Sequence, residues 1–236
     1  MRNVLGRISQ TLQNLYDRSE LDVISKALCM ELLGVGESDY WLKSELPPDK
    51  ARDELLDSAL ERLAKGEPLQ YVLGSAPFLG MDFKVGPGVL IPRPETAQLV
   101  EWVESVCTGR RGRMLDIGTG SGCIAAAMLL ERADLRGIAV DASSKALEWA
   151  EKNRALYGLE NRLKLVLNSN PSELALENQF DFITANPPYI SVSELPNLMK
   201  DVTGYEPETA LNGGEDGLDF YGEEISFEDF CQEHDL

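Results

Sequence analysis

The sequence predicts an α/β protein in which a small N-terminal helical bundle and a β-hairpin linker precede a doubly wound parallel sheet. Apolar residues repeat at helical spacing over residues 1–73. A later apolar strand, 180–185, ends at Asn186, and an earlier strand runs into a glycine loop that opens a helix, Gly118-Thr119-Gly120-Ser121-Gly122. Strands that alternate with helices favour a parallel sheet, whose ligands bind beyond the carboxyl ends of its strands.

The composition limits the class of protein. With 236 residues, 43% of them hydrophobic, the chain can bury the core of one large or two small domains. Its apolar runs are too short to cross a bilayer, and residues 1–15 lack a signal-peptide core, so we expect a cytoplasmic protein without a membrane partner. The four cysteines are scattered and the only histidine is His234, so we expect reduced thiols and no metal site.

The charge is strongly negative and unevenly placed. The formal net charge is −18, and residues 213–236 contain nine acidic residues but no Lys or Arg. Such a surface repels phosphate backbones and suits a basic protein partner, so we expect no direct contact with nucleic acid. Solubility alone is the better explanation for much of the acidity.

Helices are expected throughout residues 1–73, because leucine and isoleucine recur three or four positions apart. Pro47-Pro48 precedes one helix, Gly66 ends it, and Pro68 to Leu73 forms a short last helix. Packing is the simplest role for this bundle, and gripping a macromolecular substrate is the alternative. The expected buried series are Ile8, Leu12 and Leu15, then Leu21, Ile24, Leu28 and Leu32, then Leu56, Leu60 and Leu63.

The linker is expected as a β-hairpin over residues 74–92, where aromatic residues alternate with Gly and Pro. Pro94 can occupy the first turn of a helix whose apolar face includes Leu99, Val100 and Val103. We expect the 180–185 strand to lie beside the 113–117 strand. The other expected elements are strands at 137–140 and 163–167, a helix at 123–131, and a helix at 144–157 that Ser143 caps.

The glycine loop and the acid after the next strand indicate a site for an adenosine-type cofactor. Glycine lets the backbone approach a ligand, and Asp141 can accept both hydroxyls of a ribose. Its separation from Gly118 is near the expected ~20 residues. A dehydrogenase is the rival, but its loop more often has the spacing GxGxxG, and Asp116 would repel a pyrophosphate. Asp116 could instead bind an ammonium group, directly or through water, which favours S-adenosylmethionine (SAM).

Asn186 and the two prolines after it end the 180–185 strand. Neither Pro187 nor Pro188 has an N–H group, and Pro187 pushes Asn186 toward extended geometry. A polar amide is therefore held at the carboxyl edge of the sheet, beside two carbonyl groups and Tyr189. A plain Pro-Pro turn is the alternative, but the glycine loop favours a functional role.

These two motifs, within Asp116 to Ala125 and Asn186 to Ile190, are accompanied by further informative segments: Gln70-Tyr71-Val72-Leu73-Gly74, Leu90 to Thr96, Tyr205-Glu206-Pro207, Gly213-Gly214 and Gly217 to Tyr221. Together with Asp141 they resemble the glutamine-N5 methyltransferases that modify peptide chain release factors. Asn-Pro-Pro-Tyr alone also occurs in DNA adenine-N6 methyltransferases, but the Leu90–Thr96 and Tyr205–Pro207 segments favour the protein-glutamine enzymes.

The resemblance covers roughly residues 1–221 and implies SAM-dependent methylation of the glutamine in the Gly-Gly-Gln motif of release factors. It implies a monomer with a substrate-recognition domain at 1–73, the hairpin linker at 74–92, an incomplete methyltransferase domain at 93–222 and an acidic tail at 223–236. The implied catalytic residues are Asn186, Pro187, Pro188 and Tyr189. The implied cofactor-binding residues are Gly118, Thr119, Gly120, Ser121, Gly122, Asp141 and Asn186.

The implied mechanism relies on placement rather than on a strong base. The Asn186 side-chain oxygen and the Pro187 carbonyl would each accept one N–H of the substrate amide, and Tyr189 would stack beside it. The three glycines of the loop would shape the floor under the methionine end of SAM, and Asp141 would hold the ribose.

The chain also departs from the family pattern. Ala97 stands where the family usually has Glu, and Asn170 stands where it usually has Asp. The family continues past Tyr221 with three more strands of the sheet, which residues 223–236 do not match. We therefore expect a sheet that lacks its last strands and a chain that is poorly stable or inactive. Two alternatives remain: an adenine-N6 methyltransferase, which the charge and the expected lack of a basic patch disfavour, and an inactive relic.

Overall fold

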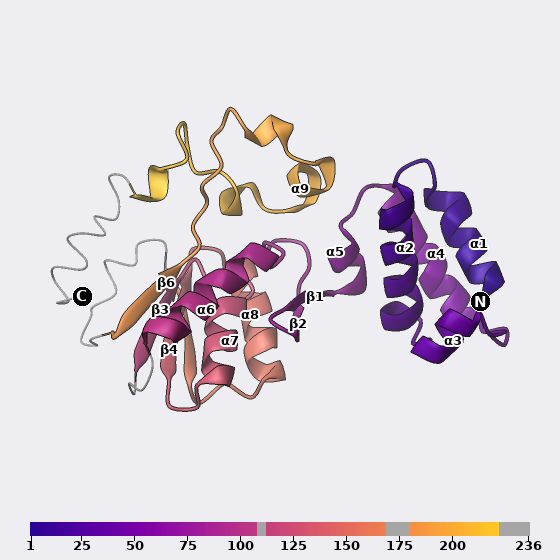
Figure 1. The fold of residues 1–236 in the computed structure, drawn as a ribbon. Coiled ribbons are helices and arrows are strands. Elements are labelled where there is room, and N and C mark those ends of the chain that lie inside the picture. The colour runs from indigo at the N-terminus through magenta and orange to yellow at the C-terminus, as the bar shows by residue number, and fades with distance from the viewer. Residues whose placement is uncertain (108–111, 169–179, 222–236) are drawn as a thin grey trace. The chain divides into compact units, whose positions relative to one another are not determined.

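A computed structural model describes residues 1–107, 112–168 and 180–221, which divide into two compact units (Figure 1). The first unit is Met1–Gly74 and the second begins at Ser75. The expectations that concern Asn170, Cys231, His234 and the 223–236 tail fall outside the described residues. None of the described helices combines the length and the apolar character that crossing a bilayer requires.

The first unit is a bundle of helices around a leucine-rich core. It contains α1 (Arg2–Leu12), α2 (Arg18–Ala27), a π-helical turn (Leu28–Leu32), α3 (Glu37–Leu42), α4 (Lys50–Ala64) and α5 (Leu69–Leu73). Asp17 and Asp49 cap α2 and α4 by accepting hydrogen bonds from backbone N–H groups. Leu15 was predicted to be buried but is 56% exposed, because α1 ends at Leu12. Core positions that match the prediction are Ile8, Leu12, Ile24, Leu28, Leu56, Leu60 and Leu63.

The second unit begins with an antiparallel hairpin and continues into a parallel sheet. The hairpin strands are β1 (Ser75–Phe78) and β2 (Met81–Lys84). The sheet contains β3 (Arg113–Ile117), β4 (Arg136–Asp141), β5 (Leu163–Leu167) and β6 (Phe182–Ala185), in the described order β5-β4-β3-β6. β6 pairs with β3, as predicted, but begins at Phe182 rather than Phe180. The carboxyl ends of β3, β4 and β6 therefore meet at one edge.

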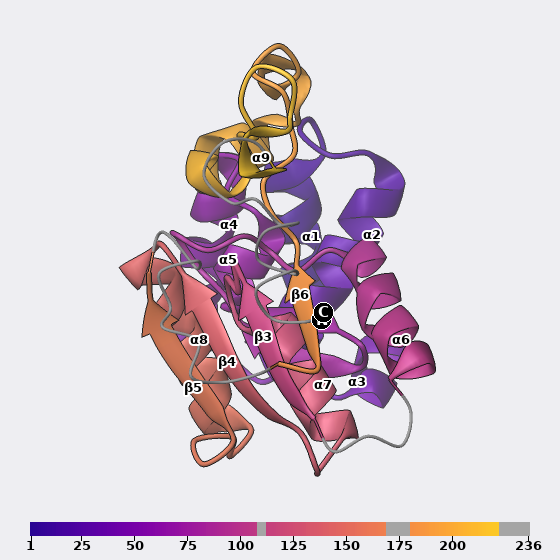
Figure 2. The same cartoon turned by 90° about the vertical axis from the view of Figure 1, so that its left-hand side faces the viewer.

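Three helices of this unit lie on one face of the sheet: α6 (Ala97–Val106), α7 (Cys123–Glu131) and α8 (Ser144–Leu156). Figure 2 looks onto the other face, which no helix of the described residues covers. Met114, Ala139 and Leu163 pack from the strands against α7, whose side chains are buried nearly all round. The predicted α/β class, the parallel sheet and the positions of α7 and α8 are confirmed.

The chain after β6 lies above the carboxyl edge of the sheet as short turns and α9 (Lys200–Tyr205) (Figure 1). Its described residues include the single 3₁₀ turns Leu195–Asn197, Glu208–Ala210 and Asp219–Tyr221. A similar turn, Pro94–Thr96, precedes α6. These turns bring polar side chains to the edge where the parallel strands end.

Candidate functional site

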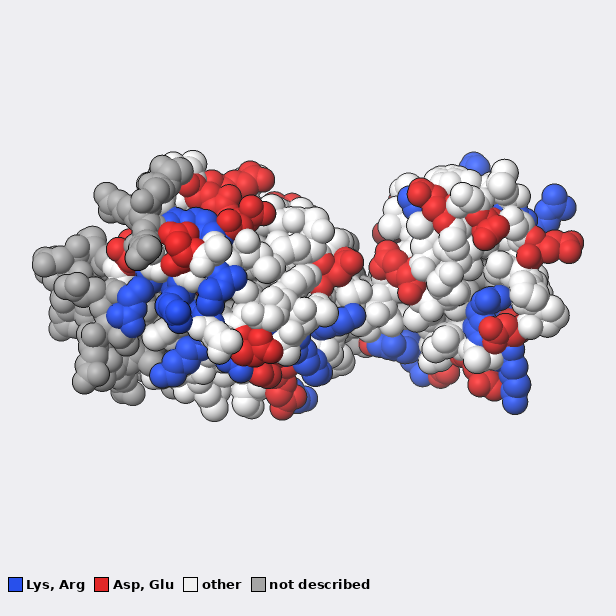
Figure 3. All heavy atoms as spheres, turned by 90° about the horizontal axis from the view of Figure 1, so that it is seen from below, with Lys and Arg blue, Asp and Glu red and all other residues white. Residues whose placement is uncertain are grey.

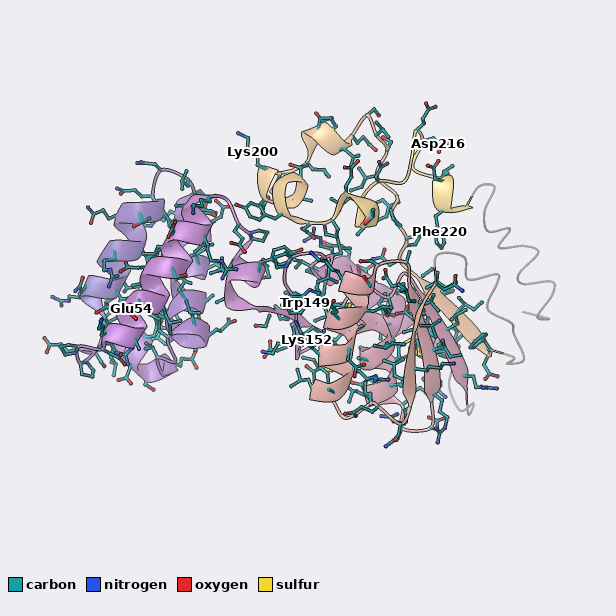
Figure 4. The ribbon with its side chains drawn as sticks, turned by 180° about the vertical axis from the view of Figure 1, so that it is seen from behind. Glu54, Trp149, Lys152, Lys200, Asp216 and Phe220 are labelled. Atoms are coloured by element: carbon teal, nitrogen blue, oxygen red, sulfur yellow. The ribbon has the colours of Figure 1, made fainter. Side chains whose placement is uncertain are left out.

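A cavity of about 520 Å³ lies at the carboxyl ends of β3, β4 and β6. Its walls come from the linker before α6, the glycine loop after β3, and the segment after β6. Ile117, Val140 and Phe220 contribute apolar surface, and Phe220 extends from the upper segment toward the sheet (Figure 4). A largely apolar cavity of this size with a few polar groups is typical of cofactor and small-molecule sites.

The glycine loop exposes its backbone to this cavity. Gly118 has φ +65° and Gly120 has φ +58°. Both backbones are left-handed, a conformation that residues other than glycine adopt only at a cost in free energy. A Cβ atom at Gly118 would meet no other atom within 4 Å, so the space beside it is open to a ligand. Thr119 and Ser121 also line the cavity.

Gly122 and Asn153 join the loop to α8. A Cβ atom at Gly122 would lie 3.4 Å from that of Ala150, so this glycine allows α7 to pack against α8 and lies behind the cavity wall. The buried Asn153 amide donates to the Ser121 carbonyl at 2.9 Å and to the Lys84 carbonyl at 3.0 Å. Sequence reasoning missed Asn153; the only signal was a polar residue on the inner face of a predicted helix.

Asp116 lies under the loop rather than in the cavity. It is fully buried, and its two oxygens accept hydrogen bonds from the Thr119 hydroxyl at 2.5 Å and the Thr184 hydroxyl at 2.7 Å. Burial raises the pKa of Asp116 to about 6, and the two hydroxyl groups oppose this rise. The expectation of direct contact with an ammonium group is therefore wrong, because no face of the carboxylate is accessible. Asp116 instead links the loop to β6.

Asp141 ends β4 and lines the cavity, as predicted. Its Oδ2 accepts from the Gly120 N–H and its Oδ1 accepts from the Ser143 N–H, both at 2.8 Å. Burial raises the pKa of Asp141, and the two N–H groups oppose this rise. Each carboxylate oxygen can accept a second hydrogen bond, so the side chain is held in place and still has capacity for two hydroxyl groups.

Asn186 lines the cavity, whereas of the three residues after it only Pro188 does so. The side chain is half-buried, and its Nδ2 donates to the Thr96 hydroxyl at 3.4 Å. Pro188 also lines the cavity, and Pro187 is buried. The Tyr189 side chain is 66% exposed and is not part of the wall in the described residues, so its predicted stacking role stays a prediction.

A glycine segment packs directly on the Asn-Pro-Pro-Tyr backbone. The Ile190 N–H donates to the Leu211 carbonyl at 3.0 Å, and the Gly213 N–H donates to the Ile190 carbonyl at 2.9 Å. A Cβ atom at Gly213 would lie 2.8 Å from the Tyr189 Cα, and one at Gly217 would lie 2.5 Å from the Tyr189 carbonyl oxygen. At such distances a Cβ atom would force the neighbouring backbone to shift, which explains why glycine stands at both positions.

Glu206 ties the upper segment to the linker. Its side chain is almost completely buried, and its oxygens accept from the Arg93 guanidinium at 2.5 Å and the Ile91 N–H at 3.0 Å. Arg93 lines the cavity beside Pro207. The two sequence segments that looked most specific, Leu90–Thr96 and Tyr205–Pro207, are therefore joined by an ion pair and a hydrogen bond.

Positive side chains gather at the opposite, amino-terminal edge of the sheet (Figure 3). Arg113 and Arg136 begin β3 and β4, and Arg162 directly precedes β5. The Arg162 guanidinium donates to the Leu129 carbonyl at 2.7 Å, near the end of α7. The expectation of a surface without a basic patch is wrong, because net charge does not report local clustering. This patch lies a strand length away from the cavity.

Two family profiles match the chain. The Methyltransferase small domain matches residues 95–202, and the PrmC N-terminal domain matches residues 3–74. Relatives named release factor glutamine methyltransferase are also similar. The one from Bacteroides thetaiotaomicron is 37% identical over 224 residues, which cover 94% of this chain and 79% of the relative. The one from Thermodesulfovibrio yellowstonii is 45% identical over 170 residues, 70% of this chain and 60% of the relative.

The chain therefore spans 60% of the length of one of these relatives and 79% of the other. Among solved structures, the hMettl16 catalytic domain in complex with MAT2A 3'UTR hairpin 6 is similar with a TM-score of 0.52 and 17% identity. The likeness covers 80% of this chain and 66% of that one, and at this identity it bears on the fold alone.

Proposed function

The chain belongs to the release factor glutamine methyltransferase family, and we propose that it transfers a methyl group from SAM to the side-chain amide nitrogen of a release-factor glutamine. The observation that carries this proposal is the position of Asn186. Its amide lines the same cavity as the open glycine loop and Asp141, so an amide-binding group and a cofactor-binding wall share one space. We assign the substrate glutamine to a Gly-Gly-Gln motif, substrate recognition to residues 1–73, and the reaction to a cytoplasmic monomer.

The described residues fit SAM. Gly118 and Gly120 leave room for close approach, and Asp141 has the capacity to accept from two ribose hydroxyl groups. Ile117, Val140 and Phe220 offer apolar surface for the rest of the cofactor. When bound, SAM supplies an electrophilic methyl group on a positively charged sulfur.

The protein's task is to make a poor nucleophile reactive. The lone pair of an amide nitrogen is delocalised into the carbonyl group, so the nitrogen needs orientation more than it needs a strong base. The Asn186 Oδ1 and the Pro187 carbonyl each accept one N–H of the substrate amide and fix its nitrogen at the strand end. Such orientation supplies several of the ~7–11 kcal/mol that placement can contribute. The chain's single histidine is His234, outside the described residues, and we assign the released proton to solvent.

Mass spectrometry of a release factor after incubation with the full chain and SAM tests this proposal. We expect the mass of one methyl group to be added to the glutamine-containing peptide, and no addition when that glutamine is replaced by asparagine. DNA and RNA incubated in parallel should remain unmodified. Methylation of adenine without methylation of the release factor would contradict the proposal.

The inactive-relic alternative predicts a different pattern. A relic would bind SAM weakly or not at all, so isothermal calorimetry of the full chain with SAM distinguishes it from an enzyme that merely lacks its correct substrate. We expect saturable SAM binding that Asp141→Ala weakens.

A further inference from the structure

The side chains of Thr96 and Asn186 meet at the cavity although 90 positions separate them in the chain. Both line the cavity wall, and both are half-buried. The Asn186 Nδ2 donates to the Thr96 Oγ1 at 3.4 Å. This is a long hydrogen bond, as contacts at catalytic sites often are before the substrate is bound.

The two ends of an asparagine amide are chemically opposite. Oδ1 accepts hydrogen bonds, whereas Nδ2 only donates them. A nitrogen that attacks a methyl group presents its own N–H donors, so it needs acceptors around it. With Nδ2 held by Thr96, Oδ1 is the end left for the substrate; a flipped amide would set donors against donors.

We propose that Thr96 is a positioning residue that fixes the orientation of the Asn186 amide, so that Oδ1 faces the substrate nitrogen. This inference rests on the proposed function, in which Asn186 binds the reacting amide. Thr96 acts through Asn186 and does not itself contact the reacting atoms.

The backbone that carries the Thr96 hydroxyl group is itself held in place. Thr96 ends the Pro94–Thr96 turn, and its N–H donates to the Arg93 carbonyl at 3.1 Å. Glu206 holds the segment directly before this turn, because it accepts hydrogen bonds from the Arg93 guanidinium and the Ile91 N–H. The partner of Asn186 is thus anchored before any substrate arrives, as preorganised positioning requires.

A matched pair of variants tests the role of the hydroxyl group. Thr96→Val removes it while keeping the shape, and Thr96→Ser keeps it. We expect kcat of Thr96→Val to fall about tenfold, the cost of one neutral hydrogen bond, while KM for the release factor and the Kd for SAM change less than about twofold. Thr96→Ser should retain most of the wild-type kcat. Unchanged or increased turnover in Thr96→Val would overturn the proposal, as would an equal loss in both variants.

A second readout does not depend on activity. The side-chain NH₂ resonances of Asn186, identified by their loss in Asn186→Ala, report its hydrogen bonding by heteronuclear NMR. We expect them to shift in Thr96→Val and to stay in place in Thr96→Ser. If wild-type protein fails to methylate the release factor, the proposed function fails while this spectrum still decides the orientation. If the chemical shifts of these resonances were unchanged in Thr96→Val, Thr96 would not hold the amide.

Discussion

Two polar side chains of the cavity, Asp141 and Asn186, differ in how far away in the chain their hydrogen-bonding partners lie. Asp141 is held by N–H groups 21 and 2 positions away, at Gly120 and Ser143. Asn186 is held by Thr96, 90 positions away. The segment before Thr96 is held in turn by Glu206, which accepts from the Ile91 N–H 115 positions away. The wall that we propose for the cofactor, formed by Asp141 and the glycine loop (the cofactor wall), is therefore built from nearby segments. The wall that we propose for the substrate, formed by Asn186 and Thr96 (the substrate wall), joins segments far apart in the chain.

This difference predicts that the two walls fail separately. A change in the local wall should weaken SAM binding and spare the chemistry, and a change in the distant wall should do the reverse. Asp116 contacts both walls, because its oxygens accept hydrogen bonds from Thr119 in the glycine loop and from Thr184 in β6. A change at Asp116 should therefore affect both walls.

The largest expected effect is that of Asn186→Ala on turnover. Removing one positioning hydrogen bond from a site of this kind should lower kcat by about 10²–10³, by analogy with the loss of an oxyanion-hole donor. SAM affinity should change less than about twofold. Single-turnover methylation with calorimetry in parallel measures both, and near-normal turnover would remove the role assigned to Asn186.

Asp116→Asn should change the pH dependence of stability. The pKa of Asp116 rises from its ordinary 3.8 to about 6 on folding, so the folded state favours the neutral acid. Its contribution to stability is most favourable below the unfolded pKa and falls as pH rises through about 6, by about 3 kcal/mol in all.

The amide variant cannot ionise, so its free energy of unfolding should rise relative to wild type between about pH 4 and pH 7. Urea unfolding at several pH values measures this difference. A constant offset across the range would show that Asp116 has an ordinary pKa in the folded protein.

Asp141→Ala should weaken SAM binding by about tenfold or more, because charge-assisted hydrogen bonds contribute roughly 1.5–3 kcal/mol. The variant also frees the N–H groups of Gly120 and Ser143, which loosens the loop. Asp141→Asn keeps one acceptor oxygen, so its SAM affinity should lie between those of the wild type and Asp141→Ala. Unchanged affinity by calorimetry would refute the assignment of Asp141 to the cofactor wall.

The smallest expected effect comes from Gly213→Ala. The new Cβ atom would lie 2.8 Å from the Tyr189 Cα, which should cost about 1 kcal/mol or more in stability and lower turnover severalfold with SAM binding preserved. Gly204→Ala is the matched control, because a Cβ atom there meets nothing within 4 Å. Equal behaviour of the two variants would show that the Gly213 contact is unimportant.

The same contrast explains what sequence reasoning could reach. The glycine loop, the Ser143 cap of α8 and the β3–β6 pairing follow from local chemistry and topology, and the structure contains all three. Leu15 was misplaced because helical periodicity does not mark where a helix ends. The burial of Asp116 was missed because a strand-end acid can point to either side of the loop.

The partners of the substrate wall could not be derived in this way. Thr96 and Glu206 stand in segments that the resemblance marked as specific, but no spacing rule relates residues so far apart. Gly213 was noted as part of a pattern without a role, because only the packed backbone shows that a Cβ atom has no room there.

The most direct test of the account is a crossed measurement on Asn186→Ala and Asp141→Ala. For each variant, SAM affinity is measured by calorimetry, and the rate of methyl transfer to the release-factor glutamine is measured at saturating SAM. The account predicts that Asn186→Ala loses the rate and keeps the affinity, while Asp141→Ala loses the affinity and keeps most of the rate. Loss of both quantities in both variants, with the fold intact, would contradict the division of the cavity into a cofactor wall and a substrate wall.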